Sequence, residues 1–333
     1  MKRRDLLKVA SSLTLGEILP PAAALAALSP AQGAAAIPSE WAPRLAHLTD
    51  DASAPLVRFS RRIDAGELMR LYDATGFSAT GRVGVKVTLE APGGPHVNPE
   101  LIAPLVRRLD ATLVDCNGFT PPRNRTESHL AAARANGFDR IGPVDILDAQ
   151  GDMELPITGG RHLSAARTGA HLARYDSLVA ITRFKGHHLP RYGGVLKSLS
   201  ICLGSIGGKA RIHSLGATDG HYTSSDERAT TEAMADAVKG ALEFRPGGWL
   251  FIGVMDAFEP DDGDPDARNL GDVGIFASAD PVALDQAMLD IAYGAAATPE
   301  IARRWTREHM ADLPACAEAI GAGSTRYRLE ELV

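Results

Sequence analysis

Hydrophobic residues follow two spacings that alternate along this chain. Short continuous apolar runs are typical of strands buried on both faces of a sheet, and apolar residues that return every three or four positions are typical of one helix face. Strands that alternate with helices predict an α/β fold with a largely parallel sheet. We expect strands at 83–88, 112–117, 144–148, 177–182, 248–256 and 273–279, and helices at 64–73, 100–109, 126–136, 164–175, 224–242 and from an N-cap at Asp280 onward.

The chain is long enough for two subdomains. Its 333 residues include 45% hydrophobic and 23% charged residues, which is the composition of an ordinary globular protein and excludes global disorder. The order of elements predicts two Rossmann-like subdomains with largely parallel sheets, at 37–158 and 159–333, with a cleft between them.

The first residues resemble a twin-arginine export signal. Arg3 and Arg4 precede Leu6, Leu7 and Lys8, and a small-x-small site stands at 34–36. The alternative is a basic helical tail. An export signal predicts that residues 1–36 are removed, that the partner is the twin-arginine export machinery, and that the mature protein is periplasmic or otherwise exported. That route carries folded proteins, often with a cofactor already installed.

Charge and cysteine usage narrow the classes of partner. The net charge of −6 and the aromatic content of 5% argue against nucleic-acid binding, which needs a basic surface or stacking platforms. No segment after the signal is apolar and long enough to span a bilayer. The three cysteines have no paired spacing, so they predict neither an iron–sulfur or zinc motif nor a disulfide framework.

The stretch 183–214 concentrates groups that can do chemistry, directly after the apolar run 177–182. A lysine there can act as a nucleophile, a Schiff-base former or an anion clamp, and an imidazole can move a proton or bind a metal. The alternative for each residue alone is a surface or structural role, and for Cys202 a small core residue. The candidates are Lys185, His187, Gly193, Gly194, Lys197, Lys209 and His213.

Polar residues also follow other predicted strands. Asp115 and Asn117 end one strand, Arg125 and His129 come soon after, and Asp256 ends another. In an α/β sheet, ligands bind beyond the carboxyl ends of the strands, so these groups predict a site lined from both halves of the chain. Asp256 is equally well explained as a turn former.

Several motifs together resemble the domain-of-unknown-function family 362. The central one is Lys185-Gly-His-x5-Gly-Gly-x2-Lys197, closed by Gly208-Lys209 and His213-Ser214. Asp115-x-Asn117 and Ala279-Asp-Pro-Val-Ala-Leu-Asp285 fit in order. Members are often labelled iron–sulfur centre proteins, but the ferredoxin-like cysteine segment is missing here, so no cluster is expected. The chain also departs from the family pattern at Ser198 and around Cys202.

A weaker resemblance is to lactate racemases, which carry a nickel-containing nucleotide. They have a similar order of His, Gly-Gly, Lys and His. The resemblance implies that Lys197 holds the cofactor, that His213 binds the metal and that His187 moves protons. The first half of the chain is only partly similar to that family, since no second catalytic His stands out near Phe119.

These observations favour an exported enzyme that acts on a small anionic substrate with a metal or metal-containing cofactor, such as a racemase, an epimerase or a hydride-transfer enzyme. His187, Lys197 and Asp115 are the predicted catalytic residues. The alternatives are a non-catalytic periplasmic protein that binds a small anion and a maturation partner of an exported metalloenzyme. The predicted cofactor-binding residues are Lys185, Gly193, Gly194, Lys197 and Lys209, the substrate-binding residues are Asn117, Arg125, His129 and Asp256, and the metal ligand is His213.

Overall fold

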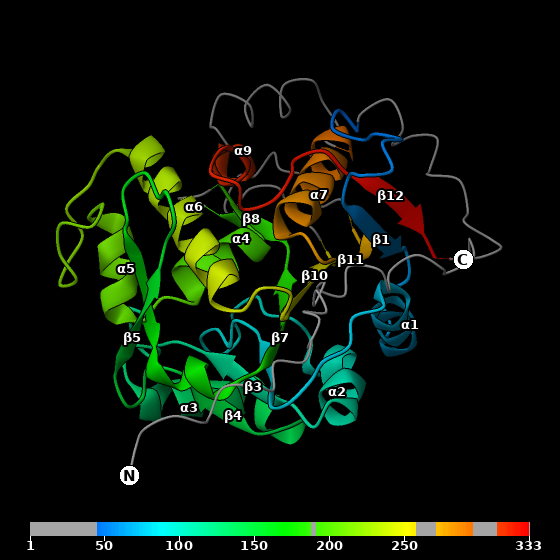
Figure 1. The fold of residues 1–333 in the computed structure, drawn as a ribbon. Coiled ribbons are helices and arrows are strands. Elements are labelled where there is room, and N and C mark those ends of the chain that lie inside the picture. The colour runs from blue at the N-terminus through cyan, green and yellow to red at the C-terminus, as the bar shows by residue number, and fades with distance from the viewer. Residues whose placement is uncertain (1–44, 188–190, 258–270, 296–311, 333) are drawn as a thin grey trace, which may run out of the picture. The chain divides into compact units, whose positions relative to one another are not determined.

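A mixed sheet of eight strands forms the centre of the computed structural model, which describes residues 45–187, 191–257, 271–295 and 312–332 (Figure 1). Seven strands run in one direction and β11 runs against them. The strands lie in the order β12 (Arg328–Glu331), β1 (Leu56–Ser60), β11 (Gly274–Ser278), β10 (Trp249–Met255), β7 (Ser177–Arg183), β2 (Val83–Lys86), β3 (Thr112–Asp115) and β4 (Val144–Ile146). The predicted α/β fold with a largely parallel sheet is confirmed.

The central strands are buried on both faces, as their continuous apolar runs predicted. In β7, Leu178 and Ala180 belong to one hydrophobic cluster, whereas Val179 and Ile181 belong to the other. Successive side chains of a strand point to opposite faces, so each face of the sheet has its own core. Both faces are therefore covered.

Different helices complete the two clusters. Buried residues of α1 (Ala65–Thr75) and α2 (Pro99–Arg108) pack in the cluster that contains Val179. Buried residues of α6 (Glu227–Phe244), α7 (Pro281–Ala295) and α9 (Asp312–Ala319) pack in the cluster that contains Leu178. Asp280 accepts hydrogen bonds from the backbone N–H groups of Val282 and Ala283, which confirms its predicted place at the start of α7.

The strand order reverses between β2 and β7. From β2 the chain moves through β3 to β4 at one edge, and it then returns to place β7 and β10 on the other side of β2. Loops that leave the carboxyl ends of β2 and β7 therefore diverge, which leaves room for a ligand at this point of an α/β sheet.

Strands from both predicted subdomains share this one sheet. β2, β3 and β4 come from the range 37–158, and β7, β10 and β11 come from the range 159–333. Residues 34–333 form one compact unit. The predicted boundary at 158 also falls inside an antiparallel hairpin of β5 (Asp152–Pro156) and β6 (Ala165–Gly169).

The helix predicted at 164–175 is wrong. Residues in the first part form β6, and a short 3-10 helix, η3 (Ala170–Arg174), follows. Ala166 and Thr168 are buried whereas Ala165 and Arg167 are partly exposed, so burial over these four residues has the period of a strand. Hydrogen bonding to β5 favours a strand here, although the spacing of alanines weakly favours a helix.

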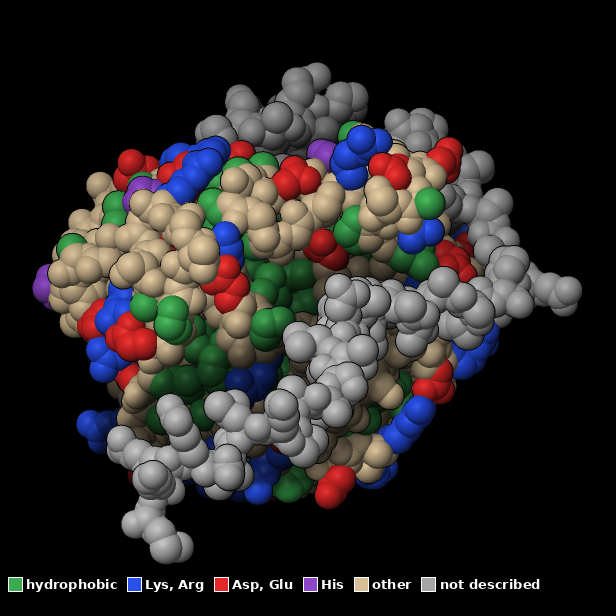
Figure 2. All heavy atoms as spheres, in the orientation of Figure 1, with side chains coloured by type: hydrophobic (Ala, Val, Ile, Leu, Met, Phe, Trp, Pro, Cys, Tyr) green, Lys and Arg blue, Asp and Glu red, His purple; other side chains and the backbone are tan. Residues whose placement is uncertain are grey.

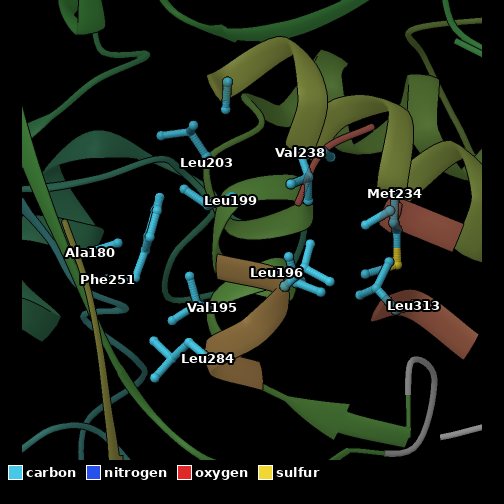
Figure 3. Packing of buried hydrophobic residues seen from close by; sticks show 14 of the residues in the cluster. Ala180, Val195, Leu196, Leu199, Leu203, Met234, Val238, Phe251, Leu284 and Leu313 are labelled. Atoms are coloured by element: carbon cyan, nitrogen blue, oxygen red, sulfur yellow. The ribbon is translucent and has the colours of Figure 1, made fainter. Parts of the chain in front are cut away.

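The stretch 183–214 is more regular than the sequence suggested. A second hairpin pairs β8 (Lys185–His187) with β9 (Arg191–Gly193). The chain then forms α4 (Val195–Lys197), a π-helical turn, η4 (Ser198–Cys202), and α5 (Ile206–His213). Figure 3 shows Val195, Leu196 and Leu199 of this segment among buried side chains of the sheet and of α6.

The predicted export signal, residues 1–36, lies outside the described residues, as do residues 258–270. Among the helices that are described, none has the length and apolarity needed to cross a membrane. The face drawn in Figure 2 mixes acidic and basic side chains and is hollowed near its middle, where hydrophobic and basic side chains reach the floor. One further helix, α3 (Thr126–Ala135), carries His129.

Candidate functional site

A pocket opens at the carboxyl ends of β2 and β7, where the strand order reverses. Its walls come from the loop after β2, the end of β7, the β8–β9 hairpin and the segment from Gly194 to Cys202. The lining residues are Thr88, Glu90, Pro95, His96, Val97, Ile181, Thr182, Arg183, Lys185, Gly193, Gly194, Lys197, Ser198 and Cys202.

Lys197 is the available positive charge of this pocket. It is half-buried on α4, and no hydrogen bond or ion pair joins its ammonium group to another described residue. The other two cations are engaged, since Arg183 Nε lies 2.6 Å from Asp256 Oδ1 and Lys185 Nζ lies 3.7 Å from Glu90 Oε1. A half-buried cation without a counter-ion favours a negatively charged ligand.

Glu90 holds the loop after β2 in an uncommon conformation. Its φ of 53° lies in the left-handed region, which residues other than glycine rarely adopt. Its carboxylate reaches Lys185 and also lies 3.4 Å from Arg123 Nη2. Backbone strain of this kind is found often at ligand sites, where surrounding contacts maintain it.

A fully buried ion pair lies beside the pocket. Lys86 Nζ at the end of β2 is 3.1 Å from Asp115 Oδ1 at the end of β3, and Lys86 also donates to Ser198 Oγ at 3.3 Å. Burial by itself would raise the pKa of Asp115, but the positive charge of Lys86, with His129 and Arg123, more than offsets it and holds that pKa well below its usual range. The pair therefore connects the sheet to a residue that lines the pocket.

Two buried side chains near Asp115 have unsatisfied polar atoms. His129 on α3 is fully buried, and neither ring nitrogen has a hydrogen-bond partner, with Nε2 3.6 Å from Asp115 Oδ2. Asn117 donates to Thr126 Oγ1, but its Oδ1 has no partner. Buried polar atoms without partners are uncommon in folded proteins and mark a place where another group could bind.

Asp285 on α7 determines where α4 begins. Its carboxylate accepts hydrogen bonds from the backbone N–H groups of Val195 at 2.8 Å and Leu196 at 2.9 Å and from the Tyr192 hydroxyl at 3.1 Å. A Cβ on Gly194 would lie 2.6 Å from this carboxylate, so glycine is needed there. Burial raises the pKa of Asp285 to about 7, despite these three donors.

His213 lies at the end of α5, away from the residues that line the pocket. The centroid of its ring lies 4.0 Å from that of Tyr222, and the Tyr222 centroid lies 4.7 Å from that of Phe119. Burial lowers the pKa of His213 to about 4, so the imidazole is neutral at pH 7. Within the described ranges, no three His, Cys, Asp or Glu side chains are grouped so that they could hold a metal ion.

The structure brings some of the predicted site residues together. Lys185, Gly193, Gly194 and Lys197 line the pocket, and Asp256 reaches it through Arg183. The backbone of His187 lies in β8, but its side chain is outside what the structure describes.

Other predicted residues have structural surroundings. Lys209 is buried and donates to the carbonyl oxygen of Gly204. Arg125 is the exposed N-cap residue of α3 and does not line the pocket, whereas Arg123 reaches Glu90. Asp115, Asn117 and His129 lie together at the end of β3, behind the pocket wall.

Sequence reasoning missed several residues that shape this site. Lys86 ends a predicted strand but is not among the predicted site residues, and Asp285 ends the motif that begins at Asp280. Ser198 and Cys202 stand out in the sequence only as departures from the family pattern, and the structure places both on the pocket wall at the π-helical turn.

Comparisons with known proteins agree with the family suggested by the motifs. The model of the domain of unknown function DUF362 matches residues 83–290. No curated protein matches the sequence. The lactate racemase apoprotein from Thermoanaerobacterium thermosaccharolyticum is similar at 13% identity and a TM-score of 0.38, over 66% of this chain and 52% of that one.

A structural-genomics protein from Thermotoga maritima is similar at 11% identity and a TM-score of 0.40, over 72% of this chain and 58% of its own. The chain thus spans between half and three fifths of the length of these two solved structures. Likenesses this distant say nothing about activity.

Replacement of Lys86 tests the buried ion pair. We expect Lys86→Met to lower the free energy of unfolding at pH 7 by about 3–5 kcal/mol, because it leaves the Asp115 carboxylate buried without a counter-charge. The pKa of Asp115 is lowered in the fold, so the pair stabilises above pH ~4 and its contribution is lost as the pH falls. The difference between wild type and variant in urea unfolding should therefore shrink in acid. The double variant with Asp115→Leu is the control and should recover part of the loss, and an unchanged Lys86→Met protein would contradict the assignment.

Asp285 should produce a pH dependence of the opposite sign. Its pKa is raised to about 7 in the fold, so the stability that it contributes is complete below pH ~4 and is lost as the pH rises toward 7. Asp285→Asn cannot ionise, so its free energy of unfolding should lack this pH dependence. In the wild type the loss should be at most about 4 kcal/mol, since each unit of pKa shift corresponds to about 1.4 kcal/mol. Urea unfolding of both proteins at pH 4.5 and 7.5 measures the difference, and parallel pH profiles would refute the explanation.

Proposed function

Because the chain belongs to the DUF362 family, whose description assigns no activity, we propose its function from the pocket itself: an enzyme that acts on a small anionic substrate. Racemisation, epimerisation and hydride transfer are the reactions we favour. The observation that carries this proposal is the ammonium group of Lys197, which has no partner among the described residues and lies in a pocket where the strand order reverses. Lys185 and Arg183 line the same pocket, each beside an acidic partner.

The pocket also holds groups that can move a proton. Ser198 Oγ lines the pocket and accepts a hydrogen bond from Lys86, whose charge favours the deprotonated form of a group bound next to it. Lys197 can donate a proton to a bound oxygen and recover it from solvent. An anion clamp combined with a proton donor is what an enzyme of this class needs, whereas a simple binding protein needs only the clamp.

A nickel-containing nucleotide fits the chemistry of two residues. Lys197 has an unengaged amine, and His213 is neutral and makes no hydrogen bond through its ring to another described residue. Such a group would supply a hydride acceptor when bound. Because His213 does not line the pocket, we propose only Lys197 there as the attachment point.

Lys197 variants test the clamp and the cofactor together. We expect Lys197→Met to weaken binding of small carboxylates and inorganic phosphate at least tenfold in calorimetry, because it removes the pocket cation that has no acidic partner among the described residues. Lys197→Arg keeps the charge and should stay within a few-fold. Binding should fall with added salt. Equal affinity in wild type and Lys197→Met would overturn the proposed function.

Mass spectrometry with elemental analysis on the protein from its native host separates the remaining possibilities. A mass addition that disappears in Lys197→Met, together with stoichiometric metal, would support an attached cofactor. An unmodified, metal-free protein that still binds anions would leave the binding protein as the better description. A protein that binds no anion but is isolated with a metalloenzyme would favour the maturation partner.

We also propose that the protein is exported by the twin-arginine route. The support is the run Arg3-Arg4 with Leu6, Leu7 and Lys8, and the small residues at 34–36. Replacement of both arginines by lysine should keep the full-length protein in the cytoplasmic fraction, while replacement of Lys8 alone by arginine should leave export intact. Export of the double-lysine variant at the wild-type level would contradict the proposal.

A further inference from the structure

The π-helical turn places two reactive groups on one wall of the pocket. In an α-helix, residues five positions apart point about 140° away from each other. A π-turn closes i to i+5 hydrogen bonds and brings such residues to the same side. The turn at Ser198–Cys202 follows Lys197 directly, and Lys197, Ser198 and Cys202 all line the pocket.

Cys202 differs from the other two thiols of the chain. Cys116 and Cys316 are each 2% exposed, and burial raises the pKa of Cys116 to about 12 and raises that of Cys316. Cys202 is half-buried at the pocket wall. The chain therefore carries its own internal controls for thiol reactivity.

Charged residues from four elements act on Cys202. Burial alone would raise its pKa, but Lys197 on α4, Lys86 on β2 and Lys209 on α5 more than offset burial and the opposing charge of Asp115 on β3. The pKa of Cys202 is therefore lowered. Positive surroundings of this kind are typical of reactive cysteines.

Besides the Lys197 ammonium group, a hydroxyl group on the same pocket lacks a hydrogen-bond partner among the described residues. The Thr182 hydroxyl oxygen at the end of β7 is buried and makes no hydrogen bond to a described residue, and Thr182 lines the pocket with Cys202. A buried hydroxyl without a partner is unfavourable unless a ligand supplies one. Thiol, ammonium and hydroxyl groups thus share one space.

We propose that Cys202 is a nucleophilic thiolate that bonds covalently to a small anionic carbonyl compound held by Lys197. The Cys202 sulfur attacks the carbonyl carbon, the C=O π electrons move to oxygen, and that oxygen takes a proton from the Lys197 ammonium, which solvent restores. The product is a hemithioacetal, and no oxidant or reductant is needed. This inference rests on the anion site proposed above.

Alkylation with a charged and a neutral reagent tests the proposal. The thiolate displaces iodide from iodoacetamide or iodoacetate, and mass spectrometry of peptides reports which cysteine is labelled. We expect Cys202 to be labelled alone in the native protein, with a half-maximal pH below that of free N-acetylcysteine. Lys197→Met should raise that pH by about one unit. Lys239→Met, which removes the same charge from α6, is the control and should leave it unchanged.

Comparison of the charged with the neutral reagent tests the anion site separately from the thiolate. Relative to N-acetylcysteine, iodoacetate should label Cys202 at least tenfold faster than iodoacetamide does, with saturation, and added phosphate should slow it. A half-maximal pH at or above the free-thiol value, or one that Lys197→Met does not move, would overturn the nucleophile. Fast labelling by iodoacetamide without preference for iodoacetate would keep the thiolate and overturn the anion site.

Discussion

The pocket depends on one buried carboxylate that ties two distant segments together. Asp285 on α7 accepts the first two free backbone N–H groups of α4 and the Tyr192 hydroxyl, and it has no counter-ion among these contacts. Without such an acceptor those N–H groups would be buried and unsatisfied. This contact sets the start of α4, and therefore where Lys197 and the π-helical turn face.

The Lys86–Asp115 pair supports one wall of the pocket through Ser198. It joins the ends of two neighbouring parallel strands, and Lys86 also donates a hydrogen bond to Ser198. A buried ion pair adds little net stability, but its loss leaves an uncompensated charge, so it constrains geometry more than it contributes energy. The positive charge of Lys86 also helps to lower the pKa of Cys202, which links this ion pair to the proposed reactivity of that thiol.

The chemistry of the site follows from unequal pairing of its charges. Arg183 and Lys185 have acidic partners, whereas Lys197 has none among the described residues. The proposed anion binding, attachment of a cofactor and support of a thiolate would all use this ammonium group. These uses are alternative or successive, and they differ in the expected mass of the protein and in the expected pH dependence of Cys202 alkylation.

The sequence by itself determined the α/β class, six of the sheet strands, the N-cap at Asp280 and the family, because apolar runs and local motifs are encoded over a few residues. It also indicated Lys185, Gly193, Gly194 and Lys197 as members of one site. Only the tertiary structure decided that the strands share one sheet, that 164–175 begins as a strand, and that His213 lies apart from the pocket. Strand pairing, the long-range hydrogen bonds of Asp285 and the π-helical turn at Cys202 depend on contacts between residues far apart in the chain, and local patterns do not specify them.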